Sequence, residues 1–506
     1  MFKKVHSCAV LGLDCQGVEV EVDISQGQPH FNIVGLPDTS IQEAKERIHS
    51  ALKNIGSSLY PYSKRLVINL APADIRKEGP AYDLPMTVGI ILAGTGYDFN
   101  LEDSLFIGEL SLEGKLRHTN GVLPVAIYGK EKGFKKLYVP FADAREASLI
   151  RGVEIIPVSD LTELLAHLSG EKQIPPFICD NIFEKENYTN YEIDMAYIKG
   201  QETAKRALEI AAAGAHNILM SGPPGSGKTL LSRSVPSILP KMEEREILEV
   251  TKIYSVAGRL PEGKPLVTER PFRTPHHTSS GVALVGGDRI PQPGEISLAH
   301  RGVLFLDEFP EFPRQVLENL RQPLEDGVVT VSRAQGTHTF PANFILIASQ
   351  NPCPCGYYGD PERPCVCSPQ QVIKYRNKIS GPLLDRIDLH VDVPRVKFEK
   401  LSSEHDGEPS EKIRERVEKA RATQMARFKD KNIITNSEMR PNEVKEFCKV
   451  DDGCMNLLKN AVVQLHLSAR SYYRILKLAR TIADLADCEN IISNHIAEAL
   501  QYRQKE

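Results

Sequence analysis

Residues 217–235 carry a pattern whose chemistry is the binding of phosphate groups. An apolar run, Asn217–Met220, predicts a buried strand, and Leu230–Val235 can continue a helix, as a phosphate-binding loop requires. Glycines let backbone N–H groups turn toward phosphate oxygens, beside the positive end of the helix. The spacing is G-x-x-x-x-G-K-T, formed by Gly222, Pro223, Pro224, Gly225, Ser226, Gly227, Lys228 and Thr229. It predicts an ATP site in which Lys228 contacts the β- and γ-phosphates and Thr229 holds Mg²⁺; an ordinary glycine turn is the weaker alternative.

Two later apolar runs end in polar residues that could act on the same nucleotide. Gly302–Leu306 is followed by Asp307 and Glu308, the Walker B pattern. Asp307 would hold Mg²⁺, and Glu308 would orient and deprotonate the attacking water. The run 344–350 is followed by Asn351, which is the sensor-1 arrangement and predicts a contact with the γ-phosphate or the water. Asn351 could instead only cap a turn.

Arg386 is a candidate for neutralising the charge that develops during phosphoryl transfer. It lies between Asp385 and Asp388, and its position resembles the arginine finger of AAA+ rings, which reaches the γ-phosphate of a neighbouring subunit. The alternative is a local salt bridge to Asp385 or Asp388, which contributes little at a surface.

A second candidate cation opens a predicted helix in the C-terminal segment. Arg470 lies in the first turn of that helix and fits sensor 2, folding back over the nucleotide. Arg474 lies one turn further on the same face and is the competing choice. The predicted catalytic set is therefore Lys228, Asp307, Glu308, Asn351, Arg386 and Arg470.

Four of the ten cysteines fall within one loop. They have the spacing C-x-C…C-x-C and are Cys353, Cys355, Cys365 and Cys367. Four soft ligands in a loop rich in proline and glycine suit tetrahedral Zn²⁺. A catalytic zinc is not expected, because four thiolates leave no open position. The prediction is a structural zinc site; the alternative is a reduced or redox-labile loop.

Two inserts interrupt the nucleotide-binding pattern. Residues 270–287 form a long glycine-rich segment, and residues 328–340 predict a β-hairpin with Arg333 at its turn. With the run 318–327, they resemble loops of the magnesium-chelatase ATPase subunit and, more distantly, of MCM helicases. In that clade such loops point into the channel of a hexamer, so the resemblance implies DNA contacts for Arg273, His276, His277 and Arg333. One alternative is that these loops pack on their own subunit. Another is that His276 and His277 bind a metal, but adjacent residues cannot lie on the same face of a helix or strand, so this alternative is weak.

The first 168 residues read as a mixed α and β domain. Val18–Ile24 alternates as a half-buried strand does, and residues 39–55 have the apolar spacing of a helix. The segments 77–81, 107–114 and 121–140 resemble the ribosomal-S5-like fold of the Lon protease domain. Ala81 stands where that family has its serine, and an apolar residue near Leu123 stands where it has its lysine. Acyl transfer by that mechanism is then impossible, so a non-proteolytic domain is expected. An unrelated α+β domain is the alternative.

Length and composition set the remaining bounds. The 506 residues allow two to four domains, and the net charge of −4 confines any nucleic-acid contact to a local patch or pore. We expect a domain at 1–168, a linker at 169–195, an α/β ATPase domain at 196–395 with the cysteine loop 353–367, and a helical lid at 396–506. No run of 18 apolar residues occurs, and with no secretory signal the expected location is the cytoplasm.

Together these segments are similar, over nearly the full length, to the YifB/ComM family of magnesium-chelatase-like AAA+ ATPases. The combination of S5-like domain, chelatase-type ATPase, cysteine loop and lid is not shared with true chelatase subunits. The resemblance implies a hexameric ATP-driven motor that binds single-stranded or branched DNA and promotes branch migration and unwinding in natural transformation and recombination. Two other readings stay open: a metal-chelatase ATPase subunit, which the N-terminal domain and cysteine loop count against, and a Lon-like protease, which Ala81 makes improbable.

Overall fold

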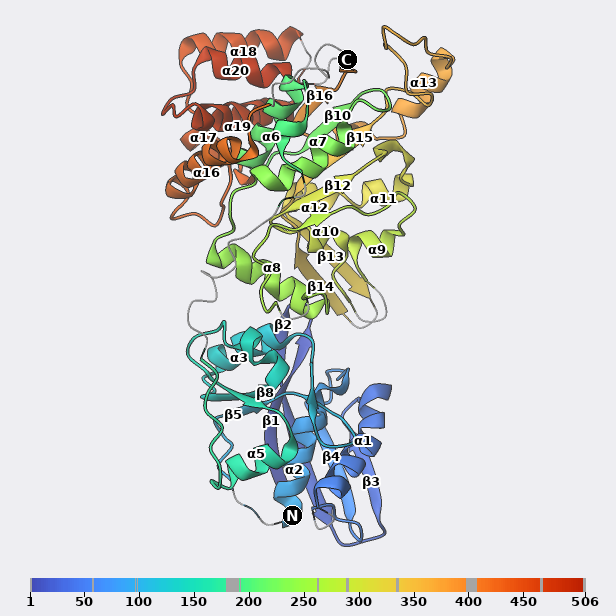
Figure 1. The fold of residues 1–506 in the computed structure, drawn as a ribbon, viewed down its shortest axis with the longest axis vertical. Helices are drawn as coiled ribbons and strands as arrows, with labels where there is room; N and C mark the ends of the chain where they lie inside the picture. The colour runs from blue at the N-terminus through green and yellow to red at the C-terminus, as the bar shows by residue number, and fades with distance from the viewer. Residues whose placement is uncertain are drawn as a thin grey trace. The chain divides into compact units, whose positions relative to one another are not determined.

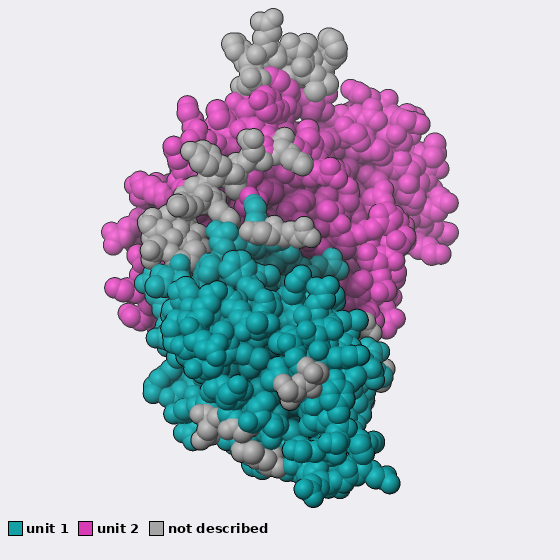
Figure 2. Space-filling model, turned by 60° about the horizontal axis from the view of Figure 1, so that its bottom comes forward, with its two compact units in different colours: residues 1–187, 247–268 teal, residues 188–246, 269–506 magenta. Residues whose placement is uncertain are grey.

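The chain folds into two compact units, coloured separately in Figure 2. The structure is a computed structural model that describes residues 2–56, 59–95, 97, 99–178, 191, 193–261, 264–287, 291–333, 336–396, 407–464 and 467–503. One unit is made of residues 1–187 and 247–268, and the other of residues 188–246 and 269–506. Residues 247–268, which the sequence analysis includes in the ATPase domain, thus group with the N-terminal residues.

The N-terminal unit is built on a seven-stranded mixed sheet with the order β3-β4-β2-β1-β5-β8-β9. The strands are β1 (Phe2–Leu11), β2 (Asp14–Ser25), β3 (His30–Val34), β4 (Arg65–Ala71), β5 (Ser104–Phe106), β8 (Lys136–Pro140) and β9 (Glu154–Val158). β2 pairs antiparallel with β1 and β4, whereas β3–β4, β1–β5, β5–β8 and β8–β9 are parallel. Burial alternates along β2 from Val18 to Ile24, which confirms the predicted half-buried strand.

Among the described residues before 187, this unit also contains five α-helices and a small hairpin. They are α1 (Thr39–Ile55), α2 (Asp83–Thr95), α3 (Val122–Lys132), α4 (Ala144–Ala147) and α5 (Leu161–Leu168), with β6 (Glu109–Leu110) and β7 (Leu116–Arg117). The helix expected at 39–55 is confirmed, and Asp38 caps it by accepting from the Ile41 N–H at 2.8 Å. α2 is buried from Asp83 to Ala93 and packs on β1 and β2, so it is central to the core.

The two positions compared with Lon proteases can be placed in this unit. Ala81 lies in a short 3₁₀ turn, 80–82, and Leu123 is fully buried in the first turn of α3. Neither side chain offers a nucleophile or a base, as the sequence requires. The S5-like assignment itself stays a prediction.

The second unit contains a five-stranded parallel sheet with the order β11-β12-β15-β10-β16. The strands are β10 (Ile218–Ser221), β11 (Phe272–Arg273), β12 (Val303–Leu306), β15 (Ile345–Gln350) and β16 (Leu389–Asp392). β10, β12 and β15 are the strands predicted before the phosphate loop, Asp307 and Asn351. Because the carboxyl ends of parallel strands lie at one edge of a sheet, this order brings the three loops together.

Helices surround this sheet and continue into a C-terminal bundle (Figure 1). The helices between residues 202 and 384 are α6 (Glu202–Gly214), α7 (Lys228–Ser234), α8 (Glu244–Val256), α9 (Gly281–Val285), α10 (Glu295–Leu298), α11 (Arg314–Glu318), α12 (Arg321–Asp326), α13 (Pro369–Arg376) and α14 (Gly381–Leu384). The later half of α8, from Ile247, belongs to the N-terminal unit. The bundle comprises α16 (Ser410–Arg427), α17 (Pro441–Phe447), α18 (Asp452–Gln464), α19 (Ala469–Leu485) and α20 (Ser493–Gln501).

The sheet and the bundle share one hydrophobic core. α16 and α19 pack on α6, and the buried cluster includes Ile218 of β10, Leu208 of α6 and Ile482 of α19. The predicted α/β fold with a helical C-terminal region is confirmed, while the boundary at 396 stays a prediction. The predicted hairpin is confirmed as β13 (Val328–Arg333) and β14 (Gly336–Pro341). No helix in the described part of the chain is both long enough and apolar enough to span a membrane.

Candidate nucleotide site and cysteine cluster

The phosphate loop connects the end of β10 to the start of α7. Gly225 and Gly227 have φ values of 75° and 92°, in the left-handed region, and a Cβ at either position would meet no atom within 4 Å. At Gly222, by contrast, a Cβ would lie 2.1 Å from the Val393 carbonyl oxygen. The start of the loop is therefore packed against the chain that follows β16, and the loop is open to a ligand at Gly225 and Gly227.

Lys228 joins the phosphate loop to the end of β15. Its side chain is 9% exposed, and its Nζ donates to the carbonyls of Gly222 at 2.7 Å and Pro223 at 2.9 Å, and to Asn351 Oδ1 at 3.3 Å. Burial lowers the pKa of Lys228, and the charge of Asp307 opposes that shift. The predicted phosphate ligand and the predicted sensor-1 residue thus lie in contact.

Asp307 lies between two hydroxyl groups. Thr229 Oγ1 donates to Asp307 Oδ2 at 2.8 Å, and Ser349 Oγ donates to Asp307 Oδ1. Thr229 and Asp307 are the residues predicted to hold Mg²⁺, and a hydroxyl with a carboxylate is the donor set this hard cation prefers. The residues present fit a Mg²⁺ site.

Glu308 adopts a left-handed backbone conformation, with φ 52°, and its side chain is 57% exposed. Its Oε2 lies 3.4 Å from His277 Nδ1, and the His277 ring packs edge-on against Phe312. The structure therefore places His277, predicted to contact DNA, beside the predicted water-activating carboxylate.

Arg386 and Arg470 share a single acidic partner. Arg386 Nη2 pairs with Glu325 and its Nη1 donates to the Pro382 carbonyl at 2.7 Å, while Arg470 Nη2 donates to Glu325 Oε1 at 2.9 Å. Arg386 pairs with neither Asp385 nor Asp388, the two partners that its sequence neighbours suggest, in the contacts of the described residues. Both arginines line a cavity of about 670 Å³ in this unit, and no phosphate-loop residue is among its described lining residues.

Arg474, the competing sensor-2 candidate, has a structural partner. Its Nη1 donates to Asp388 Oδ1 at 2.8 Å. Although burial alone would raise the pKa of Asp388, the charge of Arg474 and a hydrogen bond from His216 hold it well below its usual range. Arg474 therefore belongs to a buried ion pair, and Arg470 is the arginine that lies beside Arg386.

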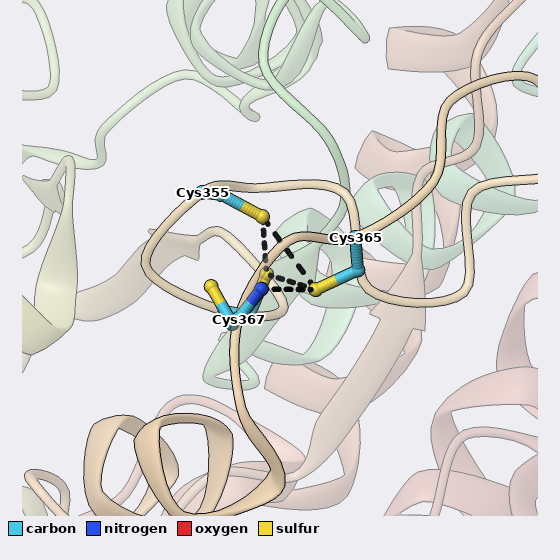
Figure 3. A group of neighbouring side chains, drawn as sticks. Cys355, Cys365 and Cys367 are labelled. Carbon is cyan, nitrogen blue, oxygen red and sulfur yellow. Dashed lines mark hydrogen bonds between the residues drawn. The ribbon is translucent and has the colours of Figure 1, made fainter.

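The four cysteines of the loop gather at one point. Their Sγ atoms all lie within 4.8 Å of one another, with separations of 3.4 Å for Cys353–Cys355, 3.7 Å for Cys353–Cys365 and 3.6 Å for Cys355–Cys365. Figure 3 shows Cys355, Cys365 and Cys367 on neighbouring turns of the loop, with their sulfur atoms close together. A disulfide would require about 2.05 Å, whereas Zn–S bonds of 2.3 Å in a tetrahedron give S···S edges of about 3.8 Å. The cluster has the size of a zinc site.

Backbone groups favour the thiolate form at Cys355. Donation from the Tyr357 N–H, with further donation from Val366, lowers the pKa of the Cys355 thiol to about 6. Although the Cys367 N–H lies 3.4 Å from Cys365 Sγ, burial and the neighbouring thiols raise the pKa of Cys365 to about 12, and they raise that of Cys367 as well. A metal-binding cysteine must lose its proton, so without a metal only Cys355 of these three is favoured as a thiolate.

The four predicted DNA-contacting residues do not form one cluster. Arg273 makes a bidentate ion pair with Glu295 at 2.6 and 2.7 Å, and exposed His276 contacts the Thr278 hydroxyl at 2.9 Å. His277 faces Glu308. The backbone of Arg333 pairs with Gly336 at the end of the hairpin, but its side chain lies outside the described residues.

Three further residues of the site have no motif of their own in the sequence. Ser349 contacts Asp307, Glu325 joins the two arginines, and Gln201 Nε2 donates to the carbonyls of Ser226 and Pro394. The role of Ser349 follows from the strand register. Leu306 of β12 pairs with Ala348 of β15, so the residues that follow them, Asp307 and Ser349, lie side by side. Glu325 and Gln201 required the tertiary structure.

Comparison with known proteins places the whole chain in one family. Three family models match: "Magnesium chelatase, subunit ChlI" at 194–401, "Subunit ChlI of Mg-chelatase" at 20–143 and "Magnesium chelatase, subunit ChlI C-terminal" at 407–503. The chain is 44% identical to Competence protein ComM of Haemophilus influenzae over 99% of this chain and 97% of that protein. It is 40% identical to YifB of Escherichia coli over 99% and 96% of the two chains.

The similarity to true chelatase subunits is narrower. The Magnesium-chelatase 67 kDa subunit of Chlorobaculum parvum is 28% identical over 31% of this chain and 23% of that protein. The full-length matches, in contrast, span both units. The chain therefore belongs to the YifB/ComM family of magnesium-chelatase-like AAA+ ATPases.

Proposed function

We propose that this AAA+ ATPase is a hexameric motor that hydrolyses ATP to drive branch migration or unwinding of DNA. The observation that carries the proposal is the assembly of Lys228, Thr229, Asp307 and Asn351 at one edge of the sheet, with Arg386 and Arg470 together at a different cavity. The name of the relative ComM, a competence protein, supports DNA as the partner.

Each residue at the sheet edge has a role in this proposal. Lys228 neutralises the β- and γ-phosphates, and Asn351 orients the γ-phosphate or the attacking water. Thr229 and Asp307 would hold Mg²⁺, which supplies further neutralisation of phosphate charge when bound. Glu308 accepts the proton of the attacking water. The exposed position of Glu308 leaves room for that water.

The two arginines suit a site that is completed by another copy of the chain. At the cavity that contains Glu325, Arg386 donates to the Pro382 carbonyl at 2.7 Å and pairs with Glu325, and Arg470 donates to Glu325 at 2.9 Å. We propose that both turn from Glu325 toward the γ-phosphate bound by a neighbouring protomer, where developing negative charge replaces the carboxylate. Ring assembly would then be required for full ATP turnover.

The DNA contacts are proposed for the inserts. Arg333 at the hairpin end, with Arg273, His276 and His277 on the first insert, would meet phosphates in a central channel. Arg273 would have to break its ion pair with Glu295 before it could bind a phosphate. We therefore expect Arg273 to contribute less to DNA affinity than Arg333.

Zinc is proposed for the cysteine cluster. Cys353, Cys355, Cys365 and Cys367 would fill all four positions of a tetrahedral ion and would cross-link the loop without offering an open position for chemistry. The role proposed for the metal is structural.

The decisive experiment is ATP turnover with and without DNA. The full-length protein should hydrolyse ATP faster with single-stranded or branched DNA, and Lys228→Ala should abolish turnover in both conditions. Wild-type rates in Lys228→Ala would refute the nucleotide site. Turnover that ignores every DNA form would refute the DNA motor and favour a chelatase-type role, which the partial match to the 67 kDa subunit leaves as the second candidate.

A further inference from the structure

The cysteine loop and the phosphate loop touch each other. Gly356, in the turn between the second and third cysteines, has φ 84°, and its N–H donates to the Cys353 carbonyl at 2.9 Å. A Cβ at Gly356 would lie 2.5 Å from Cδ and 2.7 Å from Cγ of Pro224. Only glycine allows this approach, because any larger residue would displace the proline ring of the phosphate loop.

A second attachment fixes the far side of the cysteine loop. Arg395 Nε lies 3.1 Å from Asp360 Oδ2, and the Asp360 side chain is 2% exposed. The Arg395 guanidinium also lies over the Tyr357 ring, 5.5 Å from its centroid. These contacts hold the loop to residues 393–395, immediately after β16.

The same short segment packs against the start of the phosphate loop. The Val393 N–H donates to the Ser221 carbonyl at 2.7 Å, and the Val393 carbonyl occupies the space where a Gly222 Cβ would be. Gln201 also bridges the carbonyls of Ser226 and Pro394. Two segments therefore pack against the phosphate loop: Val393–Pro394 and the turn of the cysteine loop at Gly356.

Burial alone does not explain how the cysteine loop around Gly356 is kept in one conformation. Of residues 354–368, only Gly356 is buried as a whole residue, the buried side chain of Asp360 is polar, and Val366 is 85% exposed. A segment with so little buried apolar surface does not offset the conformational entropy of ordering it. A cross-link among the four thiols supplies the missing restraint, as metal binding does in small domains.

We propose that the metal-held cysteine loop is a positioning element of the nucleotide site, which sets the conformation of the phosphate loop through the contact between Gly356 and Pro224. This inference rests on the proposed zinc and nucleotide sites and is independent of DNA. Zinc at the cluster keeps the turn at Gly356 in contact with Pro224. Loss of zinc lets this turn move away from the phosphate loop and weakens nucleotide binding. The metal ligands themselves do not touch the nucleotide.

The test compares zinc content with nucleotide affinity in full-length variants. Zinc is measured by atomic emission, and affinity by titration with a fluorescent ADP analogue without DNA. Wild-type protein should hold about one zinc per chain. Cys365→Ser should lose the zinc and raise the Kd about tenfold, the lower end of the loss seen when supporting contacts around a site are removed. Cys488→Ser, a half-buried cysteine outside the cluster, should change neither quantity.

The variant Gly356→Ala distinguishes the effect of zinc binding from the effect of the contact between Gly356 and Pro224. It leaves all four thiols in place, so it should keep the zinc and still raise the Kd, because the new Cβ moves Pro224. If Cys365→Ser does not fold, chelator extraction of zinc from wild-type protein, followed by zinc return, should raise and restore the Kd reversibly.

Three outcomes would overturn the inference. They are zinc-free wild-type protein prepared without chelators, wild-type nucleotide affinity in zinc-depleted protein, and wild-type affinity in Gly356→Ala. A protein whose nucleotide affinity depends on zinc but whose ATP turnover ignores DNA would refute only the proposed motor.

Discussion

At the scale of single residues, the site depends on how Asp307 is held. Thr229 and Ser349 donate to different carboxylate oxygens, so the plane of the carboxylate is fixed from two sides. Thr229 comes from the phosphate loop and Ser349 from β15. A residue two positions before Asn351 thus contributes to the predicted Mg²⁺ site without contacting the nucleotide.

Ser349→Ala should weaken the use of Mg²⁺. Loss of one hydrogen bond to a charged carboxylate costs about 1.5–3 kcal/mol, so we expect ATP turnover at low Mg²⁺ to fall at least about tenfold. Excess Mg²⁺ should recover part of the loss. ATPase rates across a Mg²⁺ titration measure this. Ser297→Ala is the matched control, since Ser297 is fully buried and its Oγ has no partner among the described residues. Equal Mg²⁺ dependence in the two variants would contradict the positioning role.

His277→Ala should raise ATP turnover in the absence of DNA. The contact of His277 with Glu308 occupies one carboxylate oxygen and so competes with the attacking water for it. Removing a hydrogen bond of about 1 kcal/mol predicts an increase of about fivefold in the basal rate. His30→Ala is the control, because His30 is an exposed histidine of β3, whereas the His276 ring packs on the His277 ring at 4.1 Å. A basal rate in His277→Ala at or below that of His30→Ala would refute this role.

At the scale of elements, a segment distant in sequence completes the N-terminal unit. Ser255, in the last turn of α8, donates to Glu146 Oε1 at 2.6 Å, and the Leu123 N–H donates to the same oxygen at 2.8 Å. The Gly121 N–H donates to the Ser255 carbonyl at 3.2 Å. The start of α3, the carboxyl of α4 and the end of α8 thus meet at one buried acid.

Glu146 should make stability depend on pH. Burial raises the pKa of Glu146 from 4.5 to about 7, although the hydrogen bonds from Ser255 and Leu123 oppose this rise. Between these two values the folded protein holds a proton that the unfolded chain has released, so stability falls as pH rises and the loss is complete above about 7.

Urea unfolding of the full-length protein between pH 5 and 8 measures this dependence. Glu146→Gln should flatten the fall in unfolding free energy, by on the order of 2 kcal/mol over the range. Glu131→Gln, at an exposed position of α3, should keep the wild-type slope. An unchanged slope in Glu146→Gln would show that other groups control the dependence.

At the scale of the whole molecule, the distribution of cationic groups favours an assembly. Arg386 and Arg470 converge on Glu325, whereas Lys228 and Asn351 lie at the edge of the sheet with Asp307. The net charge of −4 excludes a uniformly basic surface, so the proposed DNA contacts would have to be local. A ring that places basic inserts in its channel satisfies this requirement.

Mixed rings test whether an active site combines two copies of the chain. Lys228→Ala and Arg386→Ala should each lose ATP turnover by at least about 10³-fold, the range for an arginine finger. When the two inactive proteins are mixed, some sites should combine an intact phosphate loop from one copy with an intact Arg386 from the other. Turnover should therefore reappear. A mixture as inactive as its parts would mean that Arg386 does not serve a neighbouring subunit.

The sequence by itself determined the parts whose chemistry is local. The G-x-x-x-x-G-K-T spacing, the apolar runs before Asp307 and Asn351 and the C-x-C pairs predict the loop, the strands and the thiol cluster, because neighbours in the chain specify each of them. The helix at 39–55 and the hairpin at 328–341 follow for the same reason.

Only the tertiary structure decided which distant groups meet. Glu325 between Arg386 and Arg470, His277 beside Glu308, and Gly356 against Pro224 join residues that are far apart in the chain, by between 30 and 150 positions. Such pairs depend on strand order and loop packing, which no local pattern encodes. Side chains that contact each other across the fold have no characteristic spacing in the sequence, so these contacts can be identified only in the folded structure.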